Sequence, residues 1–235
     1  MTLGKSLRLR RIFANGRALI VDCAPLAGDR IGKVGLLARA GADAVILTPG
    51  LLDAVSEELA ALSAILRIDG GFGRRQQLLS VQAALEMGAE AVLVSVEASF
   101  PVPGEELERF GRVSEDARRL GMPVIAEIAG EEWMDVSRIV ADYGADVILV
   151  RTMGPASSDR QFIRKTGRPF LASLGEDPGG ASELLGVVYD LMQGAAQGVV
   201  LRDRGLLESQ MLRAIHGLVH QGISADEALD IANAV

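Results

Sequence analysis

The stretch Gly144-Ala145-Asp146-Val147-Ile148-Leu149-Val150-Arg151-Thr152 decides the fold of this chain. A glycine ends a helical segment, a short turn follows, and four apolar residues in succession lead to a polar one. An unbroken apolar run predicts a strand that is buried on both faces, as in a parallel sheet. Glycine provides the left-handed backbone that ends a helix before such a strand. The stretch therefore predicts one helix-to-strand step of an α/β protein.

The same step recurs along nearly the whole sequence. Three further turns carry the same punctuation: Ala40-Gly41-Ala42-Asp43, Met87-Gly88-Ala89-Glu90 and Leu120-Gly121-Met122-Pro123. Eight apolar runs are predicted to be strands, at Ala18–Asp22, Ala44–Thr48, Ala64–Asp69, Ala91–Val96, Val124–Glu127, Val147–Arg151, Phe170–Ser173 and Gly198–Leu201. The segments between them have helical periodicity. Eight such repeats indicate one (β/α)8 TIM barrel domain over residues 1–235, with 1–16 as an N-terminal extension.

A doubly wound open sheet is the structural alternative. Such a sheet often carries a glycine-rich loop after its first strand. The loop here reads Cys23-Ala24-Pro25-Leu26-Ala27-Gly28, which is not a dinucleotide-binding fingerprint.

Composition narrows the class of protein. Of the 235 residues 49% are apolar but only 4% aromatic, so the core is expected to be aliphatic, as in parallel barrels. The net charge of −7, without a sustained basic stretch, argues against nucleic acid as a partner. The single cysteine excludes an intrachain disulfide, and no apolar run has the length of a membrane span. We therefore expect a soluble cytoplasmic protein with no membrane partner.

Chemistry in such a barrel takes place at the C-terminal ends of the strands. Alternation along the strands places three candidate catalytic residues on the interior side, above apolar ones: Asp22, Glu127 and Arg151. The candidate substrate- and phosphate-binding residues at the other strand ends are Arg67, Asp69, Ser173, Arg202 and Arg204. Barrels commonly hold phosphate after the eighth strand, which favours an anion site at the last two.

Structural interpretations of these residues stay open. Glu127 and Arg151 are equally compatible with a buried ion pair that has no catalytic use. The segment Arg202-Asp203-Arg204 is also compatible with a solvated loop. Gly70-Gly71-Phe72-Gly73 is more typical of a tight turn than of a phosphate cradle.

The sequence offers few nucleophiles and metal ligands. His216 and His220, the two histidines, lie one turn apart in the last helical region, where a surface pair is expected. No metal site is predicted, although Mg²⁺ is compatible with carboxylates at the strand ends. Cys23 is expected to be a buried, inert thiol. The three lysines are Lys5, Lys33 and Lys165, and none of them occupies a strand end.

Several segments in the same order resemble the archaeal-type class I fructose-bisphosphate aldolases. They are Gly4–Phe13, Gly16–Asp22, Leu66–Gly71, Ser80–Ala89, Gly121–Glu127 and Gly144–Asp146. The resemblance covers most of the chain. It implies the barrel fold, aldol chemistry on phosphorylated sugars, and assembly into a homo-oligomer.

The resemblance also exposes differences in the active site. The family carries its Schiff-base lysine at the end of the sixth strand, where this chain has Arg151, or Leu149 without a gap. An arginine stays protonated and is a poor nucleophile toward carbonyl carbon. The family's strand-five tyrosine falls near Ala129, and the histidine after its first-strand aspartate is Cys23 here. Asp22 is kept.

Two main hypotheses about function follow, beside a less favoured third, an ordinary lysine-dependent aldolase in which Lys33 supplies the amine. The first is a divergent aldolase-like carbon–carbon lyase that binds a small anionic metabolite, a phosphorylated carbonyl compound, and works without a Schiff base. Asp22 and Glu127 then serve as general acid and base, and Arg151 stabilises the developing anion. The second is a pseudoenzyme that serves as a scaffold or partner subunit.

Overall fold

The computed structural model describes residues 1–23, 31–59, 61–70, 76–151, 166–174, 180–202 and 209–234. Eight parallel strands close into a barrel in sequence order, each hydrogen-bonded to the next and β8 to β1. The strands are β1 Ala18–Asp22, β2 Ala44–Leu47, β3 Ser63–Arg67, β4 Ala91–Glu97, β5 Val124–Ala129, β6 Val147–Val150, β7 Phe170–Ser173 and β8 Gly198–Arg202. This confirms the predicted TIM barrel.

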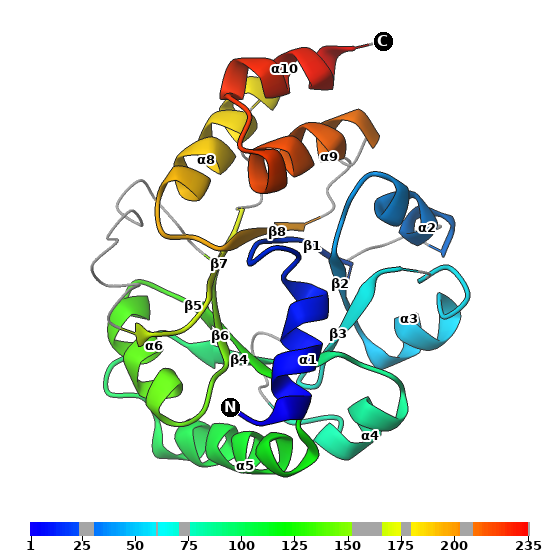
Figure 1. The fold of residues 1–235 in the computed structure, drawn as a ribbon. Coiled ribbons are helices and arrows are strands. Elements are labelled where there is room, and N and C mark those ends of the chain that lie inside the picture. The colour runs from blue at the N-terminus through cyan, green and yellow to red at the C-terminus, as the bar shows by residue number, and fades with distance from the viewer. Residues whose placement is uncertain are drawn as a thin grey trace.

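Helices surround the barrel (Figure 1). In the described residues they are α1 Leu3–Ile12, α2 Ile31–Arg39, α3 Pro49–Ala54, α4 Val81–Glu86, α5 Gly104–Leu120, α6 Trp133–Asp142, α8 Ala181–Gln193, α9 Ser209–His216, a π-helical segment Gly217–Gln221, and α10 Ala225–Asn233. None of them combines the length and apolarity that crossing a bilayer requires.

The four predicted helix-ending glycines all adopt positive φ angles. Gly41, Gly88, Gly121 and Gly144 have φ of 96°, 84°, 66° and 109°. A residue with a Cβ is disfavoured in this conformation, so these turns depend on glycine. The prediction of the helix-to-strand turns is therefore confirmed.

The barrel interior is filled by a layer of aliphatic side chains, one from each strand. They form one buried cluster: Ile20, Ile46, Ile65, Leu93, Ile125, Leu149, Leu171 and Val200. A second cluster fills the space between the strands and the outer helices and includes Cys23, which is 1% exposed as predicted. Because side chains alternate along a strand, the inner layer fixes which residues face inward above it.

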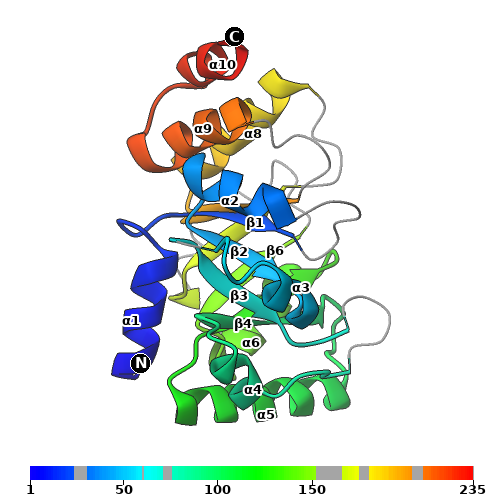
Figure 2. The same ribbon diagram turned by 90° about the vertical axis from the view of Figure 1, so that its right-hand side faces the viewer.

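Helix α1 closes the N-terminal end of the barrel. It lies across the ring of strands in Figure 1 and at one end of the barrel in Figure 2. Its Leu9 and Ile12 belong to the same buried cluster as the inner layer. Lys5 and Arg8 bind Asp146 and Glu90, which directly precede β6 and β4. The opposite end of the barrel carries the C-terminal ends of the strands.

Candidate active site

Eight inward-facing positions form a polar ring above the aliphatic layer. Each lies two residues beyond its partner in that layer: Asp22, Thr48, Arg67, Ser95, Glu127, Arg151, Ser173 and Arg202. The sharp change from aliphatic to polar side chains occurs at the C-terminal ends of the strands, where barrel enzymes hold their substrates. We call this set the polar ring.

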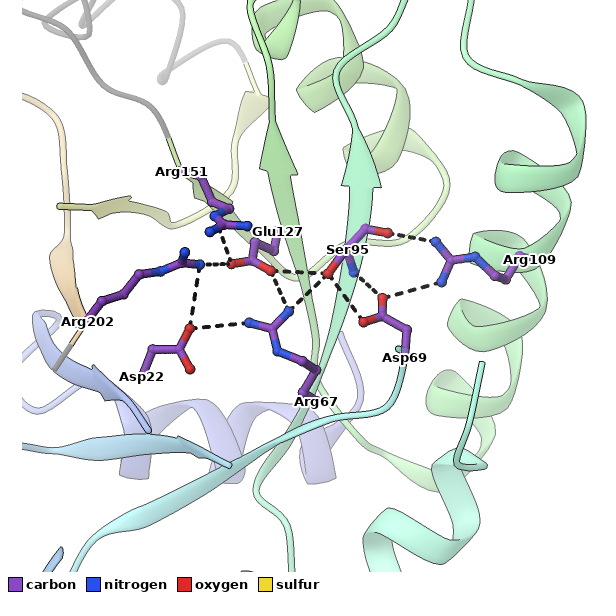
Figure 3. Close-up of polar contacts among 8 residues, drawn as sticks. All are labelled: Asp22, Arg67, Asp69, Ser95, Arg109, Glu127, Arg151 and Arg202. Carbon is purple, nitrogen blue, oxygen red and sulfur yellow. Dashed lines mark hydrogen bonds and ion pairs between the residues drawn. The ribbon is translucent and has the colours of Figure 1, made fainter. Parts of the chain in front are cut away.

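Glu127 has contacts with four other members of the polar ring (Figure 3). It is completely buried. Its Oε2 accepts hydrogen bonds from Arg67 at 2.6 Å and from the Ser95 hydroxyl at 3.1 Å. Its Oε1 accepts one from Arg202 at 2.9 Å and lies 3.8 Å from Nε of Arg151. The two oxygens thus have different partners, Arg67 and Ser95 on Oε2 and the guanidinium groups of Arg151 and Arg202 on Oε1.

Asp22 shares two of these guanidinium groups. Arg67 donates to its Oδ2 at 3.3 Å, and Arg202, its direct neighbour across the β1–β8 pair, lies 3.6 Å from the same atom. Asp22 is 1% exposed. Two buried carboxylates are therefore held by three arginines, which is the arrangement that keeps buried charges from being prohibitively costly.

Arg67 connects the two carboxylates. Its burial by itself lowers the pKa of its guanidinium. The charge of Glu127, the hydrogen bond to Glu127 and the charges of Asp22 and Asp69 more than reverse this, so its pKa lies above the ordinary value. Arg67 therefore stays a cation and cannot exchange protons with a substrate.

Where the backbone pairing of β3 and β4 ends, side-chain hydrogen bonds to the β4 backbone replace it. The two strands pair as far as Arg67 and Leu93. Beyond that point the Ser95 N–H donates to Oδ2 of Asp69 at 2.5 Å, and the Ser95 carbonyl accepts from Arg109 at 2.7 Å. Arg109 belongs to α5 and also lies 3.5 Å from Asp69. Asp69 and Arg109 thus take the place of a strand backbone and fix Ser95 beside Glu127.

The three predicted catalytic residues meet in one cluster, because Arg151 and Arg202 both reach Oε1 of Glu127, and Arg202 also lies beside Asp22. Arg67 and Asp69 belong to the same cluster. Ser173 is 3% exposed and occupies the ring. Arg204 and residues 71–73 of the glycine-rich segment lie outside the described residues.

Sequence reasoning missed Ser95 and Arg109. Ser95 is the one polar residue in the predicted strand Ala91–Val96, on its inward side, and that signal was available. Arg109 precedes the buried Phe110 on an amphipathic helix, and nothing in the pattern distinguishes it from a solvated arginine.

Several strand ends and the placement of the histidines need correction. The fifth strand extends to Ala129, two residues beyond the predicted Glu127, and four other strand ends differ from the prediction by one residue. The third strand ends at Arg67 instead of Asp69, because the Asp69 side chain, and not its backbone, binds β4. His216 and His220 are not a surface pair. His220, whose side chain is 9% exposed, binds Asp43 at 2.9 Å, and His216 binds the Gly41 carbonyl at 2.9 Å. Both rings thus bind the turn between α2 and β2.

The described residues contain no group of three or more histidine, cysteine, aspartate or glutamate side chains in a metal-binding arrangement. Of the strand-end carboxylates compatible with Mg²⁺ (Asp22, Asp69, Glu97 and Glu127), Asp22, Asp69 and Glu127 lie beside arginines.

Comparison with known proteins places the chain in a family. The sequence profile of the DeoC/LacD family aldolases matches residues 27–204, about three-quarters of the chain. The chain belongs to the DeoC/LacD aldolase family. It is 26% identical to an uncharacterized aldolase of Saccharolobus solfataricus, over 97% of this chain and 99% of that protein. It is 27% identical to 2-amino-3,7-dideoxy-D-threo-hept-6-ulosonate synthase of Halobacterium salinarum, over 99% of this chain and 97% of the synthase.

Solved aldolase structures share the fold of this family member. A Schiff-base-forming fructose-1,6-bisphosphate aldolase superposes with a TM-score of 0.77 at 21% identity, over 92% of this chain and 100% of the other. An archaeal fructose 1,6-bisphosphate aldolase gives 0.78 at 20% identity, over 93% and 100%. The resemblance to archaeal-type aldolases is thereby confirmed.

Proposed function

We propose that this aldolase-family barrel binds a small phosphorylated carbonyl metabolite at the polar ring and that any carbon–carbon bond chemistry proceeds without a Schiff base. The observation that carries the proposal is the charge of the ring. Its two carboxylates, Asp22 and Glu127, face three guanidinium groups, Arg67, Arg151 and Arg202. Three positive and two negative charges leave one positive charge in a protein whose net charge is −7.

Arg151 and Arg202 are the ring arginines best placed to receive an anion. Their side chains are 19% and 10% exposed. The Arg67 side chain is 9% exposed, and each of its two terminal nitrogens already binds a carboxylate. A guanidinium group binds phosphate or carboxylate oxygens through two parallel N–H bonds. The position of Arg202 at the end of the eighth strand matches the place where barrels commonly hold phosphate.

Anion binding is tested by calorimetric titration with inorganic phosphate and with dihydroxyacetone phosphate. We expect both to bind, and Arg151→Gln and Arg202→Gln each to weaken binding about tenfold or more, because each removes a charge-assisted contact. Arg112→Gln is the control, since its side chain is 69% exposed on α5. Equal binding by all variants would place the anion elsewhere.

The inventory of amines supports a reaction without an imine. No lysine occupies a strand end, and Lys5 lies at the opposite end of the barrel, 2.6 Å from Asp146. The Lys33 side chain and Lys165 lie outside the described residues. Incubation with dihydroxyacetone phosphate and borohydride should leave the intact mass unchanged. A covalent adduct would show that the protein forms a Schiff base, and this part of the proposal would be wrong.

In the proposed reaction, Asp22 and Glu127 move protons while Arg151 stabilises the enolate. Asp22→Asn should abolish aldol turnover of sugar phosphates and leave the circular dichroism spectrum unchanged, because asparagine keeps the shape of the side chain. Retained turnover in that variant would remove Asp22 from the mechanism.

A non-catalytic scaffold is the second candidate, and one observation favours it. Both carboxylates are almost inaccessible, at 1% and 0% exposure, and each already has guanidinium partners. If the wild-type protein binds neither phosphate nor dihydroxyacetone phosphate, the scaffold is the better account.

A further inference from the structure

We infer that Glu127 is an internal occupant of the anion site and that a bound oxyanion takes its place on Arg151 and Arg202. This inference rests on the proposed function, since it concerns the same two arginines. It explains how a completely buried carboxylate and an anion-binding site can occupy one position in the ring.

The first step of the argument is the division of partners between the two carboxylate oxygens. Oε1 faces Arg202 and Arg151, while Oε2 faces Arg67 and Ser95 (Figure 3). If Arg202 and Arg151 turn to another anion, Glu127 still keeps two hydrogen bonds through Oε2. The shorter of these is the 2.6 Å contact with Arg67. The exchange therefore does not leave a buried carboxylate unpaired, which would be the costly outcome.

The second step concerns the donors of Arg202. Its terminal nitrogen is shared between Oε1 of Glu127 at 2.9 Å and Oδ2 of Asp22 at 3.6 Å. Its Nε–H is buried and has no hydrogen-bond partner among the described residues. A buried donor without an acceptor is destabilising. A phosphate or carboxylate group binds Nε and a terminal nitrogen of one guanidinium together, so it satisfies a donor that Glu127 leaves unused.

The third step is access. Glu127 is 0% exposed, whereas the side chain of Arg151 is 19% exposed. An anion arriving from solvent therefore meets Arg151 before it meets the carboxylate. Oε1 of Glu127 then loses its contacts with Arg151 and Arg202, while Oε2 keeps its hydrogen bonds with Arg67 and Ser95.

The experiment compares phosphate affinity in three full-length proteins by calorimetry. Glu127→Gln keeps the shape of the side chain and removes the competing charge, so we expect phosphate to bind about tenfold more tightly or better than to the wild type. Asp69→Asn is the matched control. It removes an equal charge from the same cluster, but its contacts are with Ser95 and Arg109. We expect it to change the affinity less than about threefold.

The outcomes separate the two proposals. If phosphate affinity rose equally in Glu127→Gln and Asp69→Asn, the loss of one negative charge would explain the effect, and the proposed exchange would be wrong. Unchanged or weaker binding by Glu127→Gln would overturn it as well. If neither the wild type nor Glu127→Gln binds phosphate, the proposed function itself fails.

A crystal structure of the wild-type protein with phosphate tests the same inference without a variant. The phosphate should lie within hydrogen-bond distance of Arg202 Nε and of Arg151. The Glu127–Arg202 bond should be lost and the Glu127–Arg67 bond kept. Phosphate bound elsewhere, with Oε1 still on Arg202, would overturn the exchange.

Discussion

Arg67 is the residue on which both buried carboxylates depend. It binds Oε2 of Glu127 and Oδ2 of Asp22, and its side chain is 9% exposed. Arg67→Met preserves much of the apolar stem but removes both ion pairs. Removing one partner of a buried ion pair typically costs about 3–5 kcal/mol, so the free energy of unfolding should fall by that amount in urea denaturation.

An exposed ion pair is the control for this prediction. Arg112 and Glu108 lie 3.1 Å apart on α5, with side chains 69% and 68% exposed. Arg112→Met should cost less than about 1 kcal/mol, because solvent screens exposed pairs. If Arg67→Met were no more destabilising than this control, the carboxylates would not need Arg67 for folding.

At the residue scale the sequence predicted charged groups better than their connections. Asp22, Glu127 and Arg151 follow from alternation above apolar residues, a purely local rule. The substrate contact of Arg67 stays a prediction, but its place between the carboxylates of two other strands was not predicted. Such pairings depend on three-dimensional approach, which no periodicity encodes.

Among the elements, the turn before β2 depends on a close contact with the last helical region. Gly41 has φ of 96°, and a Cβ there would lie 2.6 Å from Nδ1 of His216. That ring nitrogen binds the Gly41 carbonyl at 2.9 Å. Gly41→Ala should therefore displace the ring, break this hydrogen bond and lower the melting temperature.

Gly88 provides the control for the Gly41 substitution. It ends α4 with a similar φ of 84°, but a Cβ there has no neighbour within 4 Å. Gly88→Ala should show only the cost of the left-handed backbone, about 1–2 kcal/mol. If Gly41→Ala and Gly88→Ala lowered the free energy of unfolding equally, the contact between Gly41 and His216 would add nothing to stability.

Helix α10 begins with a pH-sensitive capping box. The backbone N–H and the side-chain hydroxyl of Ser224 both donate to the Glu227 carboxylate. These two bonds, the backbone bond more than the side-chain bond, lower the pKa of Glu227 below the ordinary 4.5. The stabilisation is present above that ordinary value and is lost as the pH falls through the lowered one. Amide exchange in α10 should thus be faster in Glu227→Gln than in wild type at neutral pH. The difference should vanish in strong acid, and a difference independent of pH would contradict this account.

Element boundaries show where local reasoning succeeded and failed. The strands at Ala18–Asp22 and Phe170–Ser173 have the predicted limits, because a polar residue ends each apolar run. The third strand was predicted two residues too long at its end. There Asp69 and Arg109 replace backbone pairing with side-chain bonds, and an aspartate that binds a neighbouring strand cannot be distinguished by sequence from one that ends its own.

For the whole molecule, the repeat itself was decisive. Eight strands that are buried on both faces, joined by amphipathic helices, leave few architectures other than a closed barrel. The homo-oligomer expected from the family resemblance stays a prediction, and light scattering should give a multiple of the chain mass.

The closure of the barrel's N-terminal end by α1 was not predicted, since residues 1–16 were assigned only as an extension. Lys5 is the buried tether of that closure. Its side chain and that of Asp146 are each 7% exposed, and Asp146 also accepts from the Val124 N–H at 2.9 Å. The Lys5–Asp146 ion pair therefore joins α1 to the N-terminal ends of β5 and β6.

Lys5→Met should leave the Asp146 carboxylate buried without its cation. We expect the free energy of unfolding to fall by about 3–5 kcal/mol in urea. The paired variant Lys5→Met with Asp146→Asn should recover part of this loss, because the amide is neutral and can still accept from Val124. If Lys5→Met alone cost less than about 1 kcal/mol, Leu9 and Ile12 would hold the helix on the barrel by apolar packing, and the ion pair would be incidental.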